Sequence, residues 1–150
     1  MPVELFNEHA GFSFEWDQKL EDFLLSIFHL EGLVQKVDLN LILLNDEDLL
    51  AYNKEYLQHD YYTDIITFLI EETETALEAE LYISLDRVKD NAGVLGQAFE
   101  RELLRVFIHG VLHLCGYGDK SEEEELFMRE KENYYLKLND VSRETLFSIS

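Results

Sequence analysis

Residues 99–114 form a segment that is apolar around nearly its whole circumference when it is wound as a helix. Its apolar side chains are Leu103, Leu104, Val106, Phe107, Ile108, Val111, Leu112 and Leu114. A helix without a polar face is usually buried in the middle of a domain, because every side of it needs cover from water. The chain is expected to fold around this helix, and its 150 residues are enough to bury such a core within one domain.

The rest of the sequence predicts a sheet and four more helices. Strands are expected at residues 11–16, 37–44, 63–70 and 77–84, with a hairpin loop at 71–76. Helices are expected at residues 17 to about 29, 45–56, 86–95 and 122 to about 138, besides the central helix at about 97–115. Candidate caps are Asp17, Asn45 or Asp46, and Ser121 with Glu124 in a capping box. This order predicts an α+β fold over residues 1–150: one domain, a mixed sheet of about four strands and about five helices.

Charge and composition exclude several classes of protein. Twelve Lys and Arg residues against 32 Asp and Glu residues give a net charge of −20, which excludes a generally basic nucleic-acid binder. One cysteine, Cys115, excludes a disulfide framework and suits a reducing compartment. No apolar run approaches the ~20 residues that cross a membrane, and the first residues lack the basic and apolar pattern of a secretory signal. We therefore expect a cytoplasmic protein.

Polar residues interrupt the apolar helix at regular spacing. Arg101, Arg105, His109 and His113 stand four residues apart and form one stripe that drifts by ~40° per step. Two imidazoles one turn apart can reach one metal ion. The alternative is a pair of core histidines that are only hydrogen-bonded. The position after His109 carries Gly110, where zincin proteases have their Glu base, so a thermolysin-like protease is disfavoured.

The turn after the helix strengthens the prediction of a metal site. Gly116 can end the helix, and Gly118 gives a second permissive backbone position. Such a turn can bring Asp119 or Lys120 back over the histidines. Two histidines and one aspartate would form a three-ligand site on a central buried helix, with an open position for water.

The segment from His109 to Asp119 resembles the His-Gly-x-Leu-His-Leu-x-Gly-Tyr-Asp-His motif of the YbeY-type metal-dependent endoribonucleases. Residues 63–68 and 80–87 are similar to the preceding strands of that family. The resemblance implies an α+β metallohydrolase domain, one zinc or similar divalent ion held by His109, His113 and Asp119, and cleavage of single-stranded RNA. It further implies a role in rRNA 3′-end maturation and ribosome quality control, with rRNA and ribosomal proteins as partners.

Two residues depart from the family pattern. The third ligand of the family is histidine, where this chain has Asp119, a harder and anionic ligand that also suits divalent ions other than zinc. The family also carries an arginine after its Asn-x-x-Tyr segment, where this chain has Leu57. Arg105 and Lys120 are the predicted catalytic cations in its place, and Arg87 is a further candidate. The alternative for each is a solvated charge or an ion pair with Glu102, Glu122 or Asp86.

Other residues give weaker signals. The loop residue His59 is expected to be exposed or to approach the site, and Tyr56, Tyr61 and Tyr62 can stack RNA bases or lie half-buried. Cys115 reads as a small buried apolar residue, and His9 and His29 have no partner at a metal-binding spacing. Two alternatives to an endoribonuclease remain: a ribosome-assembly factor whose metal is structural or absent, and a metal hydrolase with another substrate.

Overall fold

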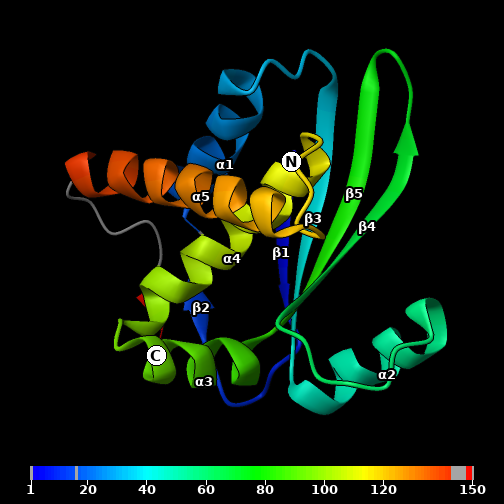
Figure 1. Cartoon of the computed structure of the whole chain (residues 1–150), viewed down its shortest axis with the longest axis vertical. Coiled ribbons are helices and arrows are strands. Elements are labelled where there is room, and N and C mark those ends of the chain that lie inside the picture. Colours follow the sequence, from blue (N-terminus) through cyan, green and yellow to red (C-terminus); the bar gives the residue numbers. More distant parts are fainter. Residues whose placement is uncertain (1, 16, 143–147, 150) are drawn as a thin grey trace.

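Four strands form a mixed sheet, and most of the helices gather on one side of it (Figure 1). The computed structural model describes residues 2–15, 17–142 and 148–149. Its strands are β1 (Val3–Asn7), β2 (Phe14–Glu15), β3 (Lys36–Leu44), β4 (Ile65–Glu72), β5 (Ala76–Ser84) and β6 (Ser148–Ile149). Its helices are α1 (Gln18–Leu30), α2 (Asp46–Leu57), α3 (Leu85–Leu95), α4 (Phe99–Leu114) and α5 (Glu122–Ser142). The predicted α+β class is confirmed.

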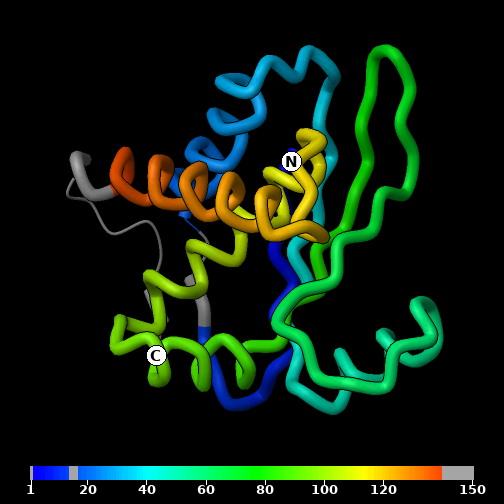
Figure 2. Tube along the Cα trace, viewed as in Figure 1, coloured from blue at the N-terminus to red at the C-terminus, as the bar shows by residue number. Residues whose placement is uncertain are grey.

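The sheet has the strand order β1-β3-β5-β4. β1, β3 and β5 are parallel, and β4 pairs antiparallel with β5 through the predicted hairpin. That hairpin extends beyond the helices at the upper right of Figure 2. The register places Leu41 beside Leu81, and both side chains are fully buried in the central strands.

The fourth strand of this sheet is β1 and not residues 11–16. β1 pairs in parallel with residues 39–43 of β3, and Val3 is fully buried. Phe14 and Glu15 do form a strand, but they pair antiparallel with β6 in a separate two-stranded sheet. Trp16, which the prediction included, lies outside the described residues. The alternation of apolar and polar residues is clearer at Phe12, Phe14 and Trp16 than at residues 3–7. Pairing with β3, a strand more than 30 residues away from residues 3–7, nevertheless decided which segment joined the sheet.

The helix α4 is the centre of the larger core, as its all-apolar sequence predicts. It packs against α1, α3, α5 and β4. Val106, Phe107, Ile108, Val111 and Leu112 are at most 1% exposed. Figure 1 shows α5 crossing over α4, with α2 apart from both. α2 instead packs near β5, in a second and smaller cluster that contains Leu44, Leu49 and Ile66.

The predicted helix caps are confirmed. Asp17 accepts a hydrogen bond from the backbone N–H of Lys19, and Asn45 accepts one from Asp48, so Asn45 and not Asp46 is the cap of α2. Ser121 and Glu124 make the reciprocal hydrogen bonds of a capping box before α5. None of the helices in the described ranges is long and apolar enough to span a bilayer.

Candidate metal centre

Two histidines on α4 and one aspartate from the following turn come together at a partly exposed position between α4 and α5. His109 and His113 lie one turn apart, on the side of α4 that faces α5. The chain then reverses at Gly116, whose φ of 106° is in the left-handed region that favours glycine. The backbone N–H of Tyr117 donates a hydrogen bond to the carbonyl oxygen of Leu112, with an N···O distance of 3.1 Å, and this bond stabilises the reversal. Asp119 is thereby returned over the two imidazoles.

Three ligand atoms converge in this centre. The Nε2 atoms of His109 and His113 are 3.0 Å apart, and Oδ2 of Asp119 lies 3.2 Å from the second and 3.4 Å from the first. Metal bonds of about 2.0–2.1 Å in tetrahedral geometry place ligand atoms about 3.3–3.4 Å apart. The cluster of His109, His113 and Asp119 can therefore hold a metal ion, and the sequence correctly brought these three residues together.

The donor chemistry of His113 fits an ion. Its Nδ1 lies 2.8 Å from the backbone carbonyl of Tyr117, and a carbonyl can only accept, so Nδ1 carries the proton. In the neutral ring, the Nε2 lone pair then points at the Nε2 atom of His109 and at the carboxylate of Asp119. The three side chains are 18%, 25% and 42% exposed for His109, His113 and Asp119, so the centre is open to solvent.

A pocket of about 420 Å³ lies between this centre and α5. Its lining residues are Arg105, His109, Asp119, Glu122, Glu125, Leu126, Met128, Arg129 and Glu132. Carboxylates outnumber cations along its walls, so its own side chains favour a cation in the centre.

Arg105 lies in this pocket, but its guanidinium is held by buried carboxylates. Nε and Nη2 donate to the two oxygens of Glu102 at 2.6 Å each, and Nη1 donates to Glu132 at 2.9 Å. Asp64 is a third partner at 3.8 Å. Burial alone would lower the pKa of Arg105, but Glu102 and Glu132 raise it above its usual range. These contacts favour the ion pair with Glu102, the alternative that the sequence left open.

The other two predicted cations lie elsewhere. Lys120 is exposed beside Asp119, and it does not line the pocket. Arg87 pairs with Asp46 at 2.7 Å and with Asp90 at 3.6 Å, and it also stacks over the ring of Tyr62. Its guanidinium belongs to the contact between α2 and α3.

Sequence reasoning missed Glu132 and Arg129, which both come from α5. Glu132 is 1% exposed, and its Oε2 lies 2.7 Å from Nδ1 of His109. Burial raises the pKa of Glu132, yet the hydrogen bond from His109 and the charge of Arg105 lower it below its usual range overall. Arg129 lines the same pocket, is 52% exposed and lies 3.5 Å from Glu132. α5 is as rich in polar residues as an ordinary solvent-exposed helix, so nothing in its sequence indicated that Glu132 contacts His109 or that Arg129 lines the pocket.

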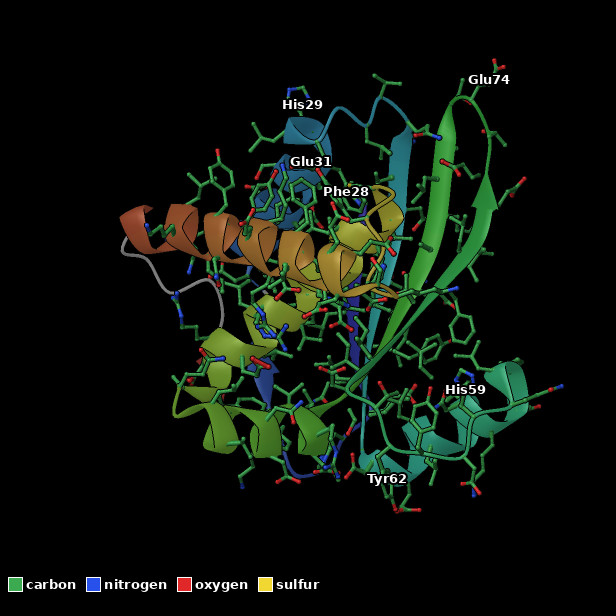
Figure 3. The ribbon with its side chains drawn as sticks, in the orientation of Figure 1. Phe28, His29, Glu31, His59, Tyr62 and Glu74 are labelled. Carbon is green, nitrogen blue, oxygen red and sulfur yellow. The ribbon has the colours of Figure 1, made fainter. Side chains whose placement is uncertain are left out.

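The weaker candidates do not join the metal centre. His59 and Tyr62 lie beside α2, apart from α4 and α5 (Figure 3). His59 is exposed and bonds to the hydroxyl of Tyr61 at 2.9 Å. His9 pairs with Asp86 at 2.9 Å. Burial raises the pKa of the half-buried Cys115 thiol to about 12, and Cys115 is not a member of the cluster of His109, His113 and Asp119.

An α+β domain with two histidines one turn apart on a buried helix, and a carboxylate returned over them, has a cluster that could hold a metal ion, and such three-ligand sets are typical of metal-dependent hydrolases. The family Endoribonuclease YbeY matches residues 4–139, which is most of the chain. The chain belongs to this family.

Individual relatives agree with this assignment. The chain is 49% identical over 102 residues to an Endoribonuclease YbeY of Cytophaga hutchinsonii, covering 68% of this chain and 71% of the relative. It is 40% identical over 139 residues to that of Amoebophilus asiaticus, covering 93% and 94%. The solution structure of TM1509 from Thermotoga maritima is similar with a TM-score of 0.57 and 27% identity, covering 95% of this chain and 96% of that one. The family resemblance seen in the motifs is therefore confirmed.

Proposed function

We propose that this protein is a metal-dependent endoribonuclease that cleaves single-stranded RNA in the cytoplasm, and that it acts in rRNA 3′-end maturation and ribosome quality control. The observation that carries the proposal is the convergence of His109, His113 and Asp119 in a chain of the Endoribonuclease YbeY family. Proposed partners are rRNA and ribosomal proteins. One zinc or similar divalent ion per chain is the proposed cofactor.

The three side chains provide the ligands that hydrolysis of a phosphodiester needs. Two imidazoles and one carboxylate would hold a divalent ion, and a three-ligand set of this kind is typical of catalytic sites that bind water or substrate. Such an ion lowers the pKa of water and polarises a phosphate oxygen. The exposure of Asp119 and of the pocket wall gives RNA access to this position.

Asp119 changes the charge of the centre relative to three histidines. A carboxylate brings one negative charge to the ion, so less positive charge remains to act on water than with a third neutral imidazole. Asp119 also extends the range of metals toward harder ions. The identity of the ion is therefore a matter for elemental analysis of the purified protein.

Arg105 and Lys120 stay the predicted catalytic cations, and Arg129 joins them as a candidate. Arg105 already satisfies two buried carboxylates, which limits its availability to a phosphate. Arg129 is half-exposed in the pocket wall and adds positive charge there, in a chain that has Leu57 in place of the family's arginine. Lys120 is exposed next to the ligand Asp119.

The net charge of −20 favours a second candidate, a ribosome-assembly factor that binds a basic partner and uses its metal only structurally. Substitution of His113 by alanine separates the two functions. For the endoribonuclease, His113→Ala should lower both metal content and cleavage of single-stranded RNA, while the fold survives because apolar packing holds α4. Metal content, cleavage and melting temperature are measured on the same preparations, with His29→Ala as an exposed histidine control.

Chelation completes this test. Cleavage should stop when the metal is removed and return when zinc is added back. If the wild-type protein cleaves equally well after chelation and His113→Ala changes only the melting temperature, the metal is structural and the proposal of a metal-dependent enzyme is wrong.

Asp119→His provides a gain-of-function test of the ligand set. A third imidazole restores the family's residue, removes one negative charge from the ion and should leave more positive charge to act on water. We expect this variant to keep its metal and to retain or raise RNA cleavage, whereas Asp119→Ala should lose metal. An Asp119→Ala protein with full metal content would remove Asp119 from the ligand set.

A further inference from the structure

We infer that Glu132 is a positioning residue of the metal centre: its carboxylate, fixed by Arg105, holds the His109 ring so that Nε2 faces the ion. The inference rests on the proposed metal site and concerns a side chain on a different helix from the histidines. It assigns a role to a buried carboxylate outside the cluster of three ligands.

The contact itself has good hydrogen-bond geometry. Oε2 of Glu132 is 2.7 Å from Nδ1 of His109, within the range of a strong charge-assisted hydrogen bond. A carboxylate only accepts, so Nδ1 donates and the Nε2 lone pair is left for a metal. Nε2 is the atom that lies 3.0 Å from His113 and 3.4 Å from Asp119. The hydrogen bond therefore selects the tautomer that the ligand set requires.

Arg105 explains how a carboxylate can be kept at this buried position. The side chain of Glu132 is 2% exposed, and an isolated charge there would be very unfavourable. Arg105 donates Nη1 to its second oxygen at 2.9 Å, so each carboxylate oxygen has a separate partner. One carboxylate oxygen of Glu132 thus accepts a hydrogen bond from Arg105, and the other accepts one from His109.

Glu102 anchors the arginine in turn. It is fully buried and accepts two hydrogen bonds from one edge of the Arg105 guanidinium, and it also accepts a hydrogen bond from Gln97 at 2.8 Å. Glu102, Arg105 and His109 follow one another along α4. Glu132 of α5 bridges Arg105 and His109, because it accepts a hydrogen bond from each of them. A carboxylate bound to the far nitrogen of a metal-binding histidine fixes the ring and raises its basicity as a ligand. This arrangement makes Arg105 part of the support of His109.

A simple packing contact between α4 and α5 would give the same distances, so the test measures metal affinity. Glu132→Gln keeps the size of the side chain and removes its charge, while Glu130→Gln makes the same change at an exposed position two residues earlier. The zinc dissociation constant of each protein is measured by competition with a chromophoric chelator. We expect Glu132→Gln to weaken zinc binding about 10–100-fold. Glu130→Gln should leave it unchanged.

A second measurement on the wild-type protein does not depend on how the variant folds. Long-range ¹H–¹⁵N spectra of the zinc-loaded protein should show His109 protonated at Nδ1 and bound through Nε2. Binding through Nδ1 would overturn the inference, as would an unchanged zinc affinity in folded Glu132→Gln. If that variant does not fold, Glu132→Asp replaces it in the affinity measurement, and the withdrawn carboxylate should still weaken zinc binding.

RNA cleavage distinguishes a failure of this inference from a failure of the proposed function. A wild-type protein that binds zinc and cleaves RNA, with full zinc affinity in Glu132→Gln, would refute the role of Glu132 alone. A wild-type protein that binds no zinc would overturn both the metal site and the inference.

Discussion

At the residue scale, Glu31 shows how a side chain far from α4 in sequence supports the turn of the metal centre. It follows the last residue of α1 and is 8% exposed. Its carboxylate accepts hydrogen bonds from the hydroxyls of Tyr117 and Tyr135, and Lys131 donates to it at 3.2 Å. Because the carbonyl of Tyr117 binds Nδ1 of His113, Glu31 helps to fix the turn that orients this ligand.

The pKa of Glu31 gives a prediction about acid stability. Burial raises this pKa, but the hydrogen bonds from Tyr117, Tyr135 and Lys131 lower it below its ordinary value of 4.5 overall. A folded-state pKa below the unfolded one stabilises the protein above the unfolded value, and this contribution is lost as the pH falls through the folded-state pKa. Glu31→Gln should therefore lower the free energy of unfolding by roughly 1.5–3 kcal/mol near neutral pH, the range for hydrogen bonds to charged groups.

Denaturant unfolding at several pH values measures this effect. The difference between the wild-type protein and Glu31→Gln should shrink as the pH falls well below 4.5, where both side chains are uncharged. Glu74→Gln, at the exposed hairpin between β4 and β5, is the control for the loss of one carboxylate. A difference that stays constant down to strongly acid pH would show that the charge of Glu31 does not stabilise the fold.

At the scale of elements, Gly110 allows α4 to lie directly on the sheet. A Cβ atom at this position would meet Cδ1 of Leu81 at 2.6 Å and Cδ1 of Ile65 at 2.9 Å. Leu81 is fully buried in β5, so it has little room to move. The residue after His109 is therefore glycine because of the sheet, which explains why this position does not carry a catalytic glutamate.

Gly110→Ala and Gly93→Ala form a matched pair of substitutions in two helices. Alanine is favoured over glycine in a helix interior by about 1 kcal/mol. At Gly93 in α3 a Cβ atom has nothing within 4 Å, so we expect Gly93→Ala to stabilise the protein by up to about 1 kcal/mol. At Gly110 the clash should outweigh this gain and destabilise the protein by about 1–3 kcal/mol. Melting temperatures that rise for both variants would contradict the close packing of α4 on β5.

At the scale of the whole molecule, the net charge of −20 opposes RNA. The basic residues at the pocket are few, with Arg105 and Arg129 in its wall and Lys120 exposed near the centre. The field of the remaining surface repels phosphates, so contact with RNA has to be local.

This charge distribution predicts a weak dependence of RNA binding on salt. Each phosphate contact with a single strand contributes about −0.7 to the slope of log K against log salt, so two or three contacts give roughly −1.4 to −2.1. Fluorescence anisotropy of a labelled single-stranded RNA, with an inactive His113→Ala protein, measures the slope. Arg129→Ala should make it shallower by about 0.7 if Arg129 contacts a phosphate. A slope several times steeper would require a broad basic surface.

The sequence by itself determined the central helix, the convergence of His109, His113 and Asp119, and most element boundaries. These features are local: apolar periodicity marks a buried helix, a four-residue spacing puts two side chains on one face, and Gly116 reverses the chain over them. Interactions between neighbours along the chain are enough to encode them.

Only the tertiary structure decided the partners of these elements. β1 joined the sheet in place of residues 11–16, because pairing with β3 depends on a strand more than 30 residues away. Glu132 contacts His109 although 23 positions separate them in the sequence, because α5 crosses over α4 at this point. The four-residue spacing correctly placed Arg105 on the same stripe as the histidines. The sequence offered Glu102 as a partner for it, but the second buried partner, Glu132, became visible only in the folded structure. A one-dimensional pattern fixes which face of a helix a side chain occupies, whereas packing between distant segments fixes what that side chain meets.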